Sequence, residues 1–492
     1  MHNRKPAILF LIFTVAIFTG LTAIFSWEKT KGFFEGKGLY FYSYDYKEKQ
    51  STPIVSTAQT DSSSRIKNVD SLKSNIEGSP SYASAMDIHK SKRSVVPDSF
   101  RLMYDSLIKT IKYLHYSDGG NGSLENFFNR LSKSNKNGKL QDLLRIWYYG
   151  DSQIEGDRIT REIRKLLQNK FGGYGFGYVP LSNPATYMHL ELGKQNDFQK
   201  LSCFQHRRKH KDFGVSGLAF APKNEYTNGD WLEMYLNVHK WLPYRSLELS
   251  MKLDSTAVVE WKHVSDSMWK AATTKRWNHM VRVFSVGDTT LRGKIQIRIK
   301  GVNPVIYGLN FQGSSQGIVI DNYGIRGHSG DGLRSISSDL LREEAKSDKL
   351  GLVVFHYGNN MVPYIKNDEK TKKWVQGIFR GLFSKYKKAC PTSSFLVIGP
   401  GSMGKKEGDE SMEYESCSIL NGWMQEVANE QGFAYFDFYR FMVDAGGILS
   451  WREKGLASLD GHLSVGGQKQ LAKTLTTSVL NAYKAFELTL EK

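Results

Sequence analysis

The segment 149–153, Tyr-Gly-Asp-Ser-Gln, constrains the fold most, because it joins a strand pattern to a helix pattern. The apolar run 144–149 that leads into it is typical of a strand. After it, apolar residues recur at helical spacing, at Ile159, Ile163, Leu166 and Leu167. A serine at such a turn is lifted out of the sheet, and we expect the N–H of Ser152 at the N-terminus of the helix. That geometry suits a nucleophile with an oxyanion donor beside it.

The chain has 492 residues, enough for two or three domains, and a formal net charge of +18. Such a charge favours anionic neighbours: a membrane surface, an acidic glycan or nucleic acid. The sequence contains no aromatic-plus-basic motif of the nucleic-acid modules and no zinc-finger spacing, so we predict no nucleic-acid partner. Three cysteines are too few for a disulfide framework. We expect Cys203, Cys390 and Cys417 to be free buried thiols, with Cys390–Cys417 as the conceivable pair.

The N-terminal residues resemble a membrane anchor. The stretch 6–27 contains no charged residue and is long enough to cross the hydrocarbon core as a helix. Arg4 and Lys5 precede it, which favours an N-terminus in the cytoplasm and a body on the periplasmic side. We therefore predict an uncleaved transmembrane anchor over 1–27, with a cleaved signal peptide as the alternative.

Residues 28–97 change character, and 51–80 is rich in Ser, Thr, Asn and Asp. This composition cannot bury enough apolar surface to order itself, so 28–97 is predicted to be a flexible linker. A tether of this length has an r.m.s. reach on the order of 50 Å. It would let the folded domain work away from the membrane, unless it is a spacer without function.

From residue 98 the chain reads as folded, with short helices at 99–114 and 124–131 before the strand at 144. Four more β-rich runs follow, at 317–321, 352–357, 395–399 and 433–438. Helical stretches separate and follow them, near 331–346, 369–388, 412–430 and 466–486. This alternation predicts an α/β domain whose mostly parallel sheet is covered on both faces.

The middle of the chain, 186–315, breaks that rhythm. Apolar residues alternate with polar ones in the runs 232–238, 247–253 and 295–299. Period two with frequent turns predicts an antiparallel β-sandwich, inserted between two parts of the α/β domain at 98–185 and 316–492. The insert either holds a large substrate or is purely structural. Four tryptophans are candidates for stacking on sugars, although packing in the core is commoner: Trp231, Trp241, Trp261 and Trp277.

Four segments in chain order resemble the conserved-order blocks of the SGNH (GDSL-like) hydrolase superfamily. They are Gly150–Ser152, Asn322–Gly327, Tyr357–Asn360 and Asp460–His462. The resemblance covers about 98–185 and 316–492, and the inserted β-domain is similar to the layout of bacterial peptidoglycan O-acetyl esterases. It implies a flavodoxin-like parallel sheet and a serine esterase. The expected reaction removes acyl groups, acetyl first, from a cell-envelope polysaccharide such as peptidoglycan, through an acyl-enzyme.

The resemblance assigns Ser152 as nucleophile and His462 as its general base and later general acid, since a serine hydroxyl needs a base within hydrogen-bond reach. Asp460 would orient His462 and stabilise its cation. The superfamily's usual acid stands three residues before the histidine, where this chain has Leu459. Either the loop is one residue shorter, or the site is a Ser–His dyad with a backbone carbonyl orienting the ring. We expect Asp151 to be structural, forming hydrogen bonds within the turn that presents Ser152.

An oxyanion formed by acyl attack needs preorganised donors. The first is the N–H of Ser152. The second is the N–H of Gly327, whose missing side chain allows close approach to the substrate, with Gly324 as the alternative. The third is the side-chain amide of Asn360, with Asn359 as the alternative.

No cofactor or metal is predicted. The glycine-rich segment 172–177 follows a helix rather than a strand, so it is predicted to be a helix stop and flexible turn rather than a dinucleotide loop. His206 and His210 stand among arginines and lysines, a poor environment for a divalent cation. The expected partners are an acylated polysaccharide, the membrane through the N-terminal helix, and a membrane-bound acyltransferase.

Two alternative functions are compatible with the same sequence. An O-acetyltransferase would pass the acyl group to a glycan hydroxyl with identical residues. A non-catalytic glycan-binding protein would carry a degenerate hydrolase domain. The spacing of Asp460 and the presence of Met361, where the superfamily has an acid, leave this third function open.

Overall fold

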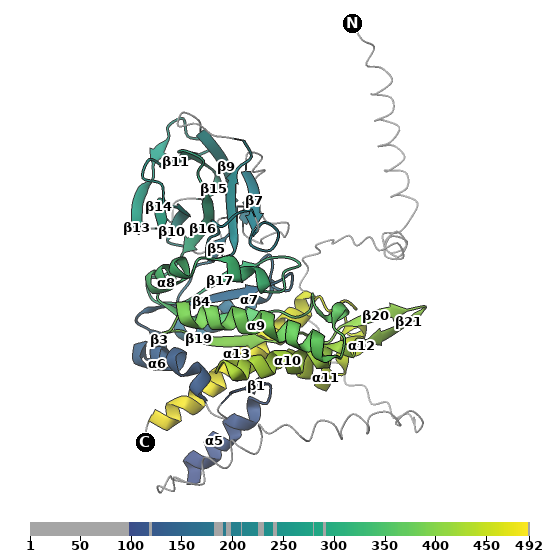
Figure 1. Cartoon of the computed structure of the whole chain (residues 1–492). Coiled ribbons are helices and arrows are strands. Elements are labelled where there is room, and N and C mark those ends of the chain that lie inside the picture. Colours follow the sequence, from purple (N-terminus) through teal and green to yellow (C-terminus); the bar gives the residue numbers. More distant parts are fainter. Residues whose placement is uncertain are drawn as a thin grey trace, which may run out of the picture. The chain divides into compact units, whose positions relative to one another are not determined.

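The computed structural model describes residues 98–117, 121–181, 190–192, 198–207, 209–224, 231–239, 244–278, 280–288 and 292–490. All of them lie within one compact unit (Figure 1). The predicted anchor at 1–27 and linker at 28–97 lie outside these residues. Among the helices that are described, none is both long and apolar enough to cross a bilayer.

The centre of the α/β part is a six-stranded sheet in the order β1-β22-β19-β18-β4-β17. Its strands are β1 (Leu114–His115), β4 (Leu143–Gly150), β17 (Gly317–Gly324), β18 (Leu350–His356), β19 (Ser394–Ile398) and β22 (Ala434–Phe436). All pairs are parallel except β1 with β22 at the edge. Numbered along the chain, the parallel strands follow the order 2-1-3-4-5 of flavodoxin-like sheets. The predicted sheet and its order are confirmed.

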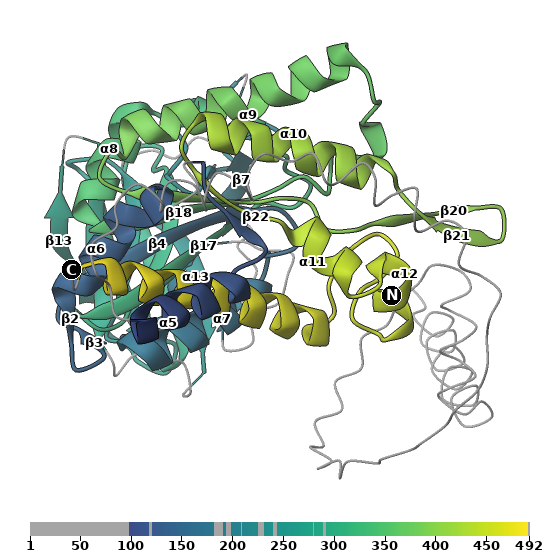
Figure 2. The same cartoon turned by 90° about the horizontal axis from the view of Figure 1, so that it is seen from below.

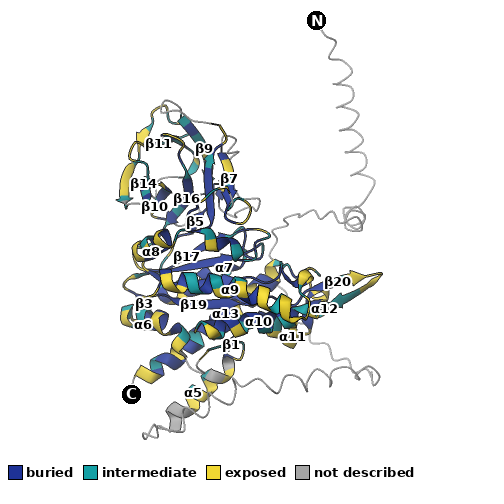
Figure 3. Cartoon of the chain, in the orientation of Figure 1, coloured by how far each residue is buried: buried dark blue, intermediate teal, exposed yellow. Residues whose placement is uncertain are grey.

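Helices cover both faces of this sheet (Figure 2). One face carries α8 (Ser338–Ser347), α9 (Glu369–Ala389) and α10 (Ser416–Glu430), and the other carries α6 (Glu125–Ser134), α7 (Arg158–Phe171) and α13 (Val465–Leu490). Successive side chains of β4 enter opposite cores: Tyr148 shares a core with α13, whereas the ring of Tyr149 contacts that of Tyr386 on α9. The sheet is therefore buried on both sides, and the exposed residues lie on the outer faces of the helices (Figure 3).

Some elements differ from the sequence prediction. The helix expected at 331–346 is divided into a 3₁₀ turn, η2 (Asp331–Ser335), and α8, because the Ser337 side chain caps α8 by accepting from Leu340 N. Helix α10 begins only at Ser416, since β20 (Gly404–Glu407) and β21 (Glu410–Glu413) form a hairpin before it. Helices α11 (Phe438–Asp444) and α12 (Gly447–Glu453) were not predicted.

The insert consists of two antiparallel sheets, as predicted. One has the order β13-β14-β10-β16-β8-β7 with β5 paired to β16, and the other has the order β12-β11-β15-β9-β6. The first contains β5 (Gly177–Val179), β7 (Phe198–Ser202), β8 (Leu218–Pro222), β10 (Ser246–Lys252), β13 (Thr273–Trp277), β14 (Val281–Asp288) and β16 (Ile306–Gln312). The second contains β6 (Leu190–Leu192), β9 (Trp231–Val238), β11 (Val258–His263), β12 (Lys270–Ala271) and β15 (Gly293–Lys300). Thus β5 joins the insert's sheet although it precedes the predicted boundary at 186.

The glycine-rich segment after α7 stops the helix as predicted, with Gly172 at φ +81 after Phe171. It is not a free turn, however. A Cβ on Gly173 would lie 2.7 Å from the backbone of Ile318, and one on Gly175 would lie 2.5 Å from Gly313 N. Ile318 N also donates to Gly172 O at 3.0 Å. The chain therefore enters and leaves the insert through two backbones in direct contact, which only glycine permits at this separation.

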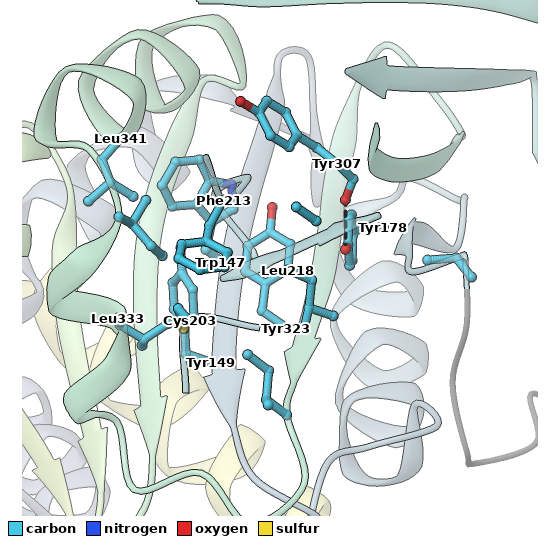
Figure 4. Packing of buried hydrophobic residues seen from close by; sticks show 14 of the residues in the cluster. Trp147, Tyr149, Tyr178, Cys203, Phe213, Leu218, Tyr307, Tyr323, Leu333 and Leu341 are labelled. Atoms are coloured by element: carbon cyan, nitrogen blue, oxygen red, sulfur yellow. Dashed lines mark hydrogen bonds between the residues drawn. The ribbon is translucent and has the colours of Figure 1, made fainter. Parts of the chain in front are cut away.

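The insert shares a hydrophobic core with the parallel sheet (Figure 4). Trp147 and Tyr323 from the sheet belong to the same buried cluster as Phe213 and Tyr307 from the insert. Beneath this cluster, Arg145 binds Asp321 at 2.8 Å and Gln312 Oε1 at 2.7 Å. The ion pair lies within the parallel sheet, whereas Gln312 belongs to β16, so its bond to Arg145 ties the insert to the sheet. The three cysteines are free and buried, as expected.

Candidate active site

Ser152 lies just beyond the carboxyl end of β4, where the sheet order reverses between β4 and β18. This reversal is the position at which open α/β sheets bind ligands. The serine belongs to a turn over residues 151–157, and α7 begins only at Arg158. The expectation that its N–H stands at the N-terminus of α7 was therefore wrong. Gly156 and Asp157 have φ of +71° and +63°, which prevents the helix from starting earlier.

Asp151 holds this turn in place. Its Oδ1 accepts from Gln153 N at 2.9 Å, and its Oδ2 accepts from the Asn360 amide at 3.0 Å. The carboxyl is buried, and this burial raises its pKa to about 6. Asp151 thus acts as the expected brace of the turn and ties it to the end of β18.

His462 reaches Ser152 from the loop between α12 and α13. Its Nε2 lies 2.8 Å from Ser152 Oγ, and its Nδ1 lies 3.0 Å from Asp460 Oδ2. With the Nδ1 proton donated to Asp460, Nε2 is an acceptor for the serine hydroxyl. The hydrogen bond with Asp460 raises the pKa of His462 and holds the pKa of Asp460 well below its usual range. The structure therefore brings together the three side chains predicted from sequence.

The unusual two-residue spacing is accommodated by the loop itself. Ser458 N donates to His462 O at 2.9 Å, and the Ser458 hydroxyl bonds both that carbonyl and Asp460 Oδ1. This closed loop turns Asp460 toward the ring, while Leu459 packs near Gly404. The Asp460 side chain is 64% exposed, unlike the buried acid of many serine triads.

Of the two candidate asparagines, Asn360 adjoins the turn that carries Ser152. Its Nδ2 donates to Asp151 Oδ2 at 3.0 Å and to His328 O at 3.2 Å. Asn359 is buried, and its Oδ1 accepts instead from Gly401 N at 3.0 Å. Both amide hydrogens of Asn360 are therefore engaged, so donation to an oxyanion requires it to release one of these acceptors.

The two candidate glycines also differ. Gly324 N donates to Asn322 Oδ1 at 3.0 Å, so that N–H is already used. Gly327 has φ +72, and within the described residues its N–H has no acceptor. Phe204, from the insert, lies beside it: its ring is 3.9 Å from where a Gly327 Cβ would stand and 5.5 Å from the ring of His328. The insert thus reaches the predicted oxyanion site.

Gln153 is a site residue that the sequence reasoning missed. Its side chain is buried, its Nε2 donates to Gly461 O at 2.7 Å, and its Oε1 accepts from Leu463 N at 3.4 Å. The Gln153 side chain is therefore hydrogen-bonded to the backbone on both sides of His462. Its place directly after the nucleophile was the only signal in the sequence.

No metal centre is evident in the part of the chain that the structure describes, where no three His, Cys, Asp or Glu side chains converge. His206 and His210 have ring centroids 6.2 Å apart, and His206 Nδ1 accepts from Ser202 N. Of the tryptophans singled out in the insert, Trp231 and Trp261 are half-buried. Trp241 and the side chain of Trp277 lie outside the described residues.

A parallel sheet in this order, with a serine after its first strand and a histidine before its last helix, is the arrangement that the resemblance to the SGNH (GDSL-like) hydrolases implies. The predicted resemblance is thus confirmed at the level of fold. The four sequence blocks meet at one edge of the sheet, three of them directly after β4, β17 and β18.

One solved structure shares this fold over most of the chain, and others match parts of it. A peptidoglycan O-acetylesterase is 20% identical, with a TM-score of 0.57 over 76% of this chain and 99% of that one. The matched share of this chain is larger than the two α/β parts, 98–185 and 316–492, taken together. The similarity therefore extends into the insert. A GDSL-like lipase from Parabacteroides merdae ATCC 43184 is 15% identical, with a TM-score of 0.25 over 33% of this chain and 74% of that one. An acetylxylan esterase from Geobacillus stearothermophilus is 19% identical, with a TM-score of 0.26 over 33% and 73%. No protein-family model and no curated protein matches the sequence.

Proposed function

We propose that this protein is a serine esterase that removes acyl groups, acetyl first, from a cell-envelope polysaccharide such as peptidoglycan. One observation carries the chemistry: Ser152 Oγ lies 2.8 Å from His462 Nε2, whose Nδ1 lies 3.0 Å from Asp460. A hydroxyl, a base and an acid in this relation are what acyl transfer requires.

The geometry supports the following reaction through an acyl-enzyme. His462 Nε2 takes the proton of Ser152 as Oγ attacks the ester carbonyl carbon, and Asp460 stabilises the resulting imidazolium. The carbonyl oxygen becomes an oxyanion that accepts from the N–H groups of Ser152 and Gly327 and from Asn360. Each such donor lowers the barrier by about 3 kcal/mol. Collapse breaks the ester bond, and His462 returns the proton to the departing sugar hydroxyl. Water, activated in the same way, releases the acyl group from Ser152.

The substrate class has three supports. The similar structure over most of the chain is a peptidoglycan O-acetylesterase. The net charge of +18 suits an anionic polymer. The predicted anchor at 6–27, with Arg4 and Lys5 before it, would place the body on the periplasmic side of the inner membrane. A membrane-bound acyltransferase that produces the ester is the partner proposed there.

Hydrolysis of 4-nitrophenyl acetate by the wild type and by Ser152→Ala tests the esterase. The variant should lose kcat by about 10³-fold or more, because it removes the nucleophile. Ser265→Ala, at an exposed serine of the insert, is the matched control and should retain the full rate. Equal rates in the wild type and Ser152→Ala would leave only a glycan-binding role.

A second assay separates hydrolysis from transfer. O-acetylated peptidoglycan is expected to release free acetate with the wild type alone. If a labelled acetyl donor instead gives acetylated glycan and little free acetate, the protein is an O-acetyltransferase with the same residues.

A further inference from the structure

A second group of charged side chains borders the nucleophile's turn and plays no part in the proposed chemistry. Glu155 stands three residues after Ser152 in that turn and is buried, with 1% of its surface exposed. Arg326 stands between Gly324 and Gly327 and contacts it: Nε lies 2.8 Å and Nη2 2.7 Å from Glu155 Oε2. One carboxylate oxygen thus anchors the guanidinium to the catalytic turn.

The rest of the Arg326 side chain faces solvent. It is 56% exposed, and within the described residues its Nη1 has no acceptor. A guanidinium held by one edge presents its other N–H groups in a fixed direction, which is the geometry that binds a carboxylate or phosphate.

A second cation, Lys200 of β7, lies near enough to Glu155 and Arg326 for their charges to act on its ammonium, although it forms no ion pair with Glu155. Lys200 is half-buried. Burial lowers the pKa of its ammonium, the Glu155 carboxylate raises it, and the nearby Arg326 guanidinium lowers it. One buried carboxylate thus has the contacting Arg326 and the nearby Lys200 around it, so the group as a whole carries an excess positive charge. The single negative charge of Glu155 balances one of the two cations but not both.

The same side of the turn carries further positive charge. Arg158 Nη1 donates to Ser152 O at 3.2 Å. Asp151, in the same turn, is buried and accepts a hydrogen bond from Asn360. An anionic group seated at Arg326 would lie next to Gly327, where the ester carbonyl is expected to bind.

We propose that Arg326 and Lys200 form an anion subsite beside Ser152, which takes a carboxylate or phosphate carried by the acylated polymer. The inference rests on the proposed function and narrows it to esters on anionic glycans. The part of the insert that supplies Lys200 then has a role in substrate selection.

The test compares kcat/KM for O-acetylated N-acetylglucosamine oligosaccharide, which is neutral, with two anionic substrates. One is an O-acetylated disaccharide with the free carboxylate of muramic acid, and the other is an O-acetylated sugar phosphate. The wild type should prefer at least one anionic substrate, and the one preferred identifies the source of the anion. Arg326→Gln and Lys200→Gln should each lower the anionic-to-neutral ratio about tenfold, through KM, because each removes a charge-assisted hydrogen bond.

Arg342→Gln is the matched control. Arg342 is 55% exposed and paired with Asp339 on α8, so its loss should leave the ratio unchanged. The double variant Glu155→Gln/Arg326→Gln removes both partners of the ion pair, so that no buried carboxylate is left unpaired, and should give the same loss as Arg326→Gln. Equal ratios in the wild type and in both single variants would overturn the subsite.

A binding measurement tests the anion subsite independently of the proposed esterase activity. Calorimetry with the non-acetylated muramic-acid disaccharide and a neutral chitobiose requires no turnover. Preference for the anionic disaccharide that is lost in Arg326→Gln supports the subsite even if no ester is cleaved. Equal binding of both sugars by the wild type would refute it even if the esterase is active.

Discussion

Replacing Gln153 by methionine should disable His462 without touching the triad. Methionine has the same length but forms no strong hydrogen bond, so the bonds to Gly461 O at 2.7 Å and from Leu463 N at 3.4 Å are lost. Each buried group left unpaired costs about 1–3 kcal/mol. The short bond contributes most, because 3.4 Å is near the limit of a useful hydrogen bond.

A cost of about 2 kcal/mol destabilises the closed loop by roughly 30-fold, since 1.4 kcal/mol corresponds to a factor of ten. We therefore expect kcat of Gln153→Met for 4-nitrophenyl acetate to fall about 10- to 100-fold, with KM changed little, because the substrate still contacts the same surface. Amide hydrogen exchange in the loop 458–464 should accelerate in parallel.

Gln376→Met separates this effect from a general loss of stability. Gln376 is also buried and also donates through a 2.7 Å bond, but to Glu426 and far from the His462 loop in sequence. It should lower the melting temperature to a similar extent and leave kcat intact. A Gln153→Met enzyme with kcat within threefold of wild type, or an equal kcat loss in Gln376→Met, would refute the reasoning.

Two further substitutions test other parts of the molecule. Asp460→Asn should lower kcat by about 10- to 100-fold rather than the 10⁴-fold of a buried acid, because Asp460 is 64% exposed. Asp460 raises the pKa of His462, and His462 must be neutral to act as a base, so the substitution should also move the acid limb of the pH–rate profile to lower pH. An acid limb that does not move would contradict the pairing of Asp460 with His462. Gly175→Ala should destabilise the fold by about 2–4 kcal/mol in urea unfolding, because its φ of +113 and the 2.5 Å approach to Gly313 N admit no Cβ. An unchanged urea midpoint would show that the two backbones can separate freely.

Much of the architecture could be read from periodicity. The runs 144–149 and 352–357 are apolar except for Arg145 and His356, because both faces of the sheet are covered. Strand β15 alternates, because the sandwich buries one of its faces only. The start of α7 could not be read in this way. Its delay to Arg158 depends on positive φ values at Gly156 and Asp157, and Asp157 is held there by Arg164 at 2.6 Å.

The site was predictable only as far as family resemblance reached. Ser152 and His462 are 310 residues apart, and no local pattern indicates that they meet. The blocks suggested that they do, and also favoured Asn360 over Asn359. The hydrogen bond from Gln153 to Gly461 joins residues that are similarly far apart in the sequence, and none of the four blocks indicates it. Only the structure reveals this contact.

The contact between the entering and leaving strands of the insert has a consequence for how a polymer is handled. Ser314 N bonds to Tyr174 O at 3.1 Å and Ile318 N to Gly172 O, so the two crossings form one welded neck. A neck of this kind permits no jaw-like closure of sandwich on catalytic sheet. A substrate must therefore reach Ser152 without any movement of the sandwich toward the parallel sheet.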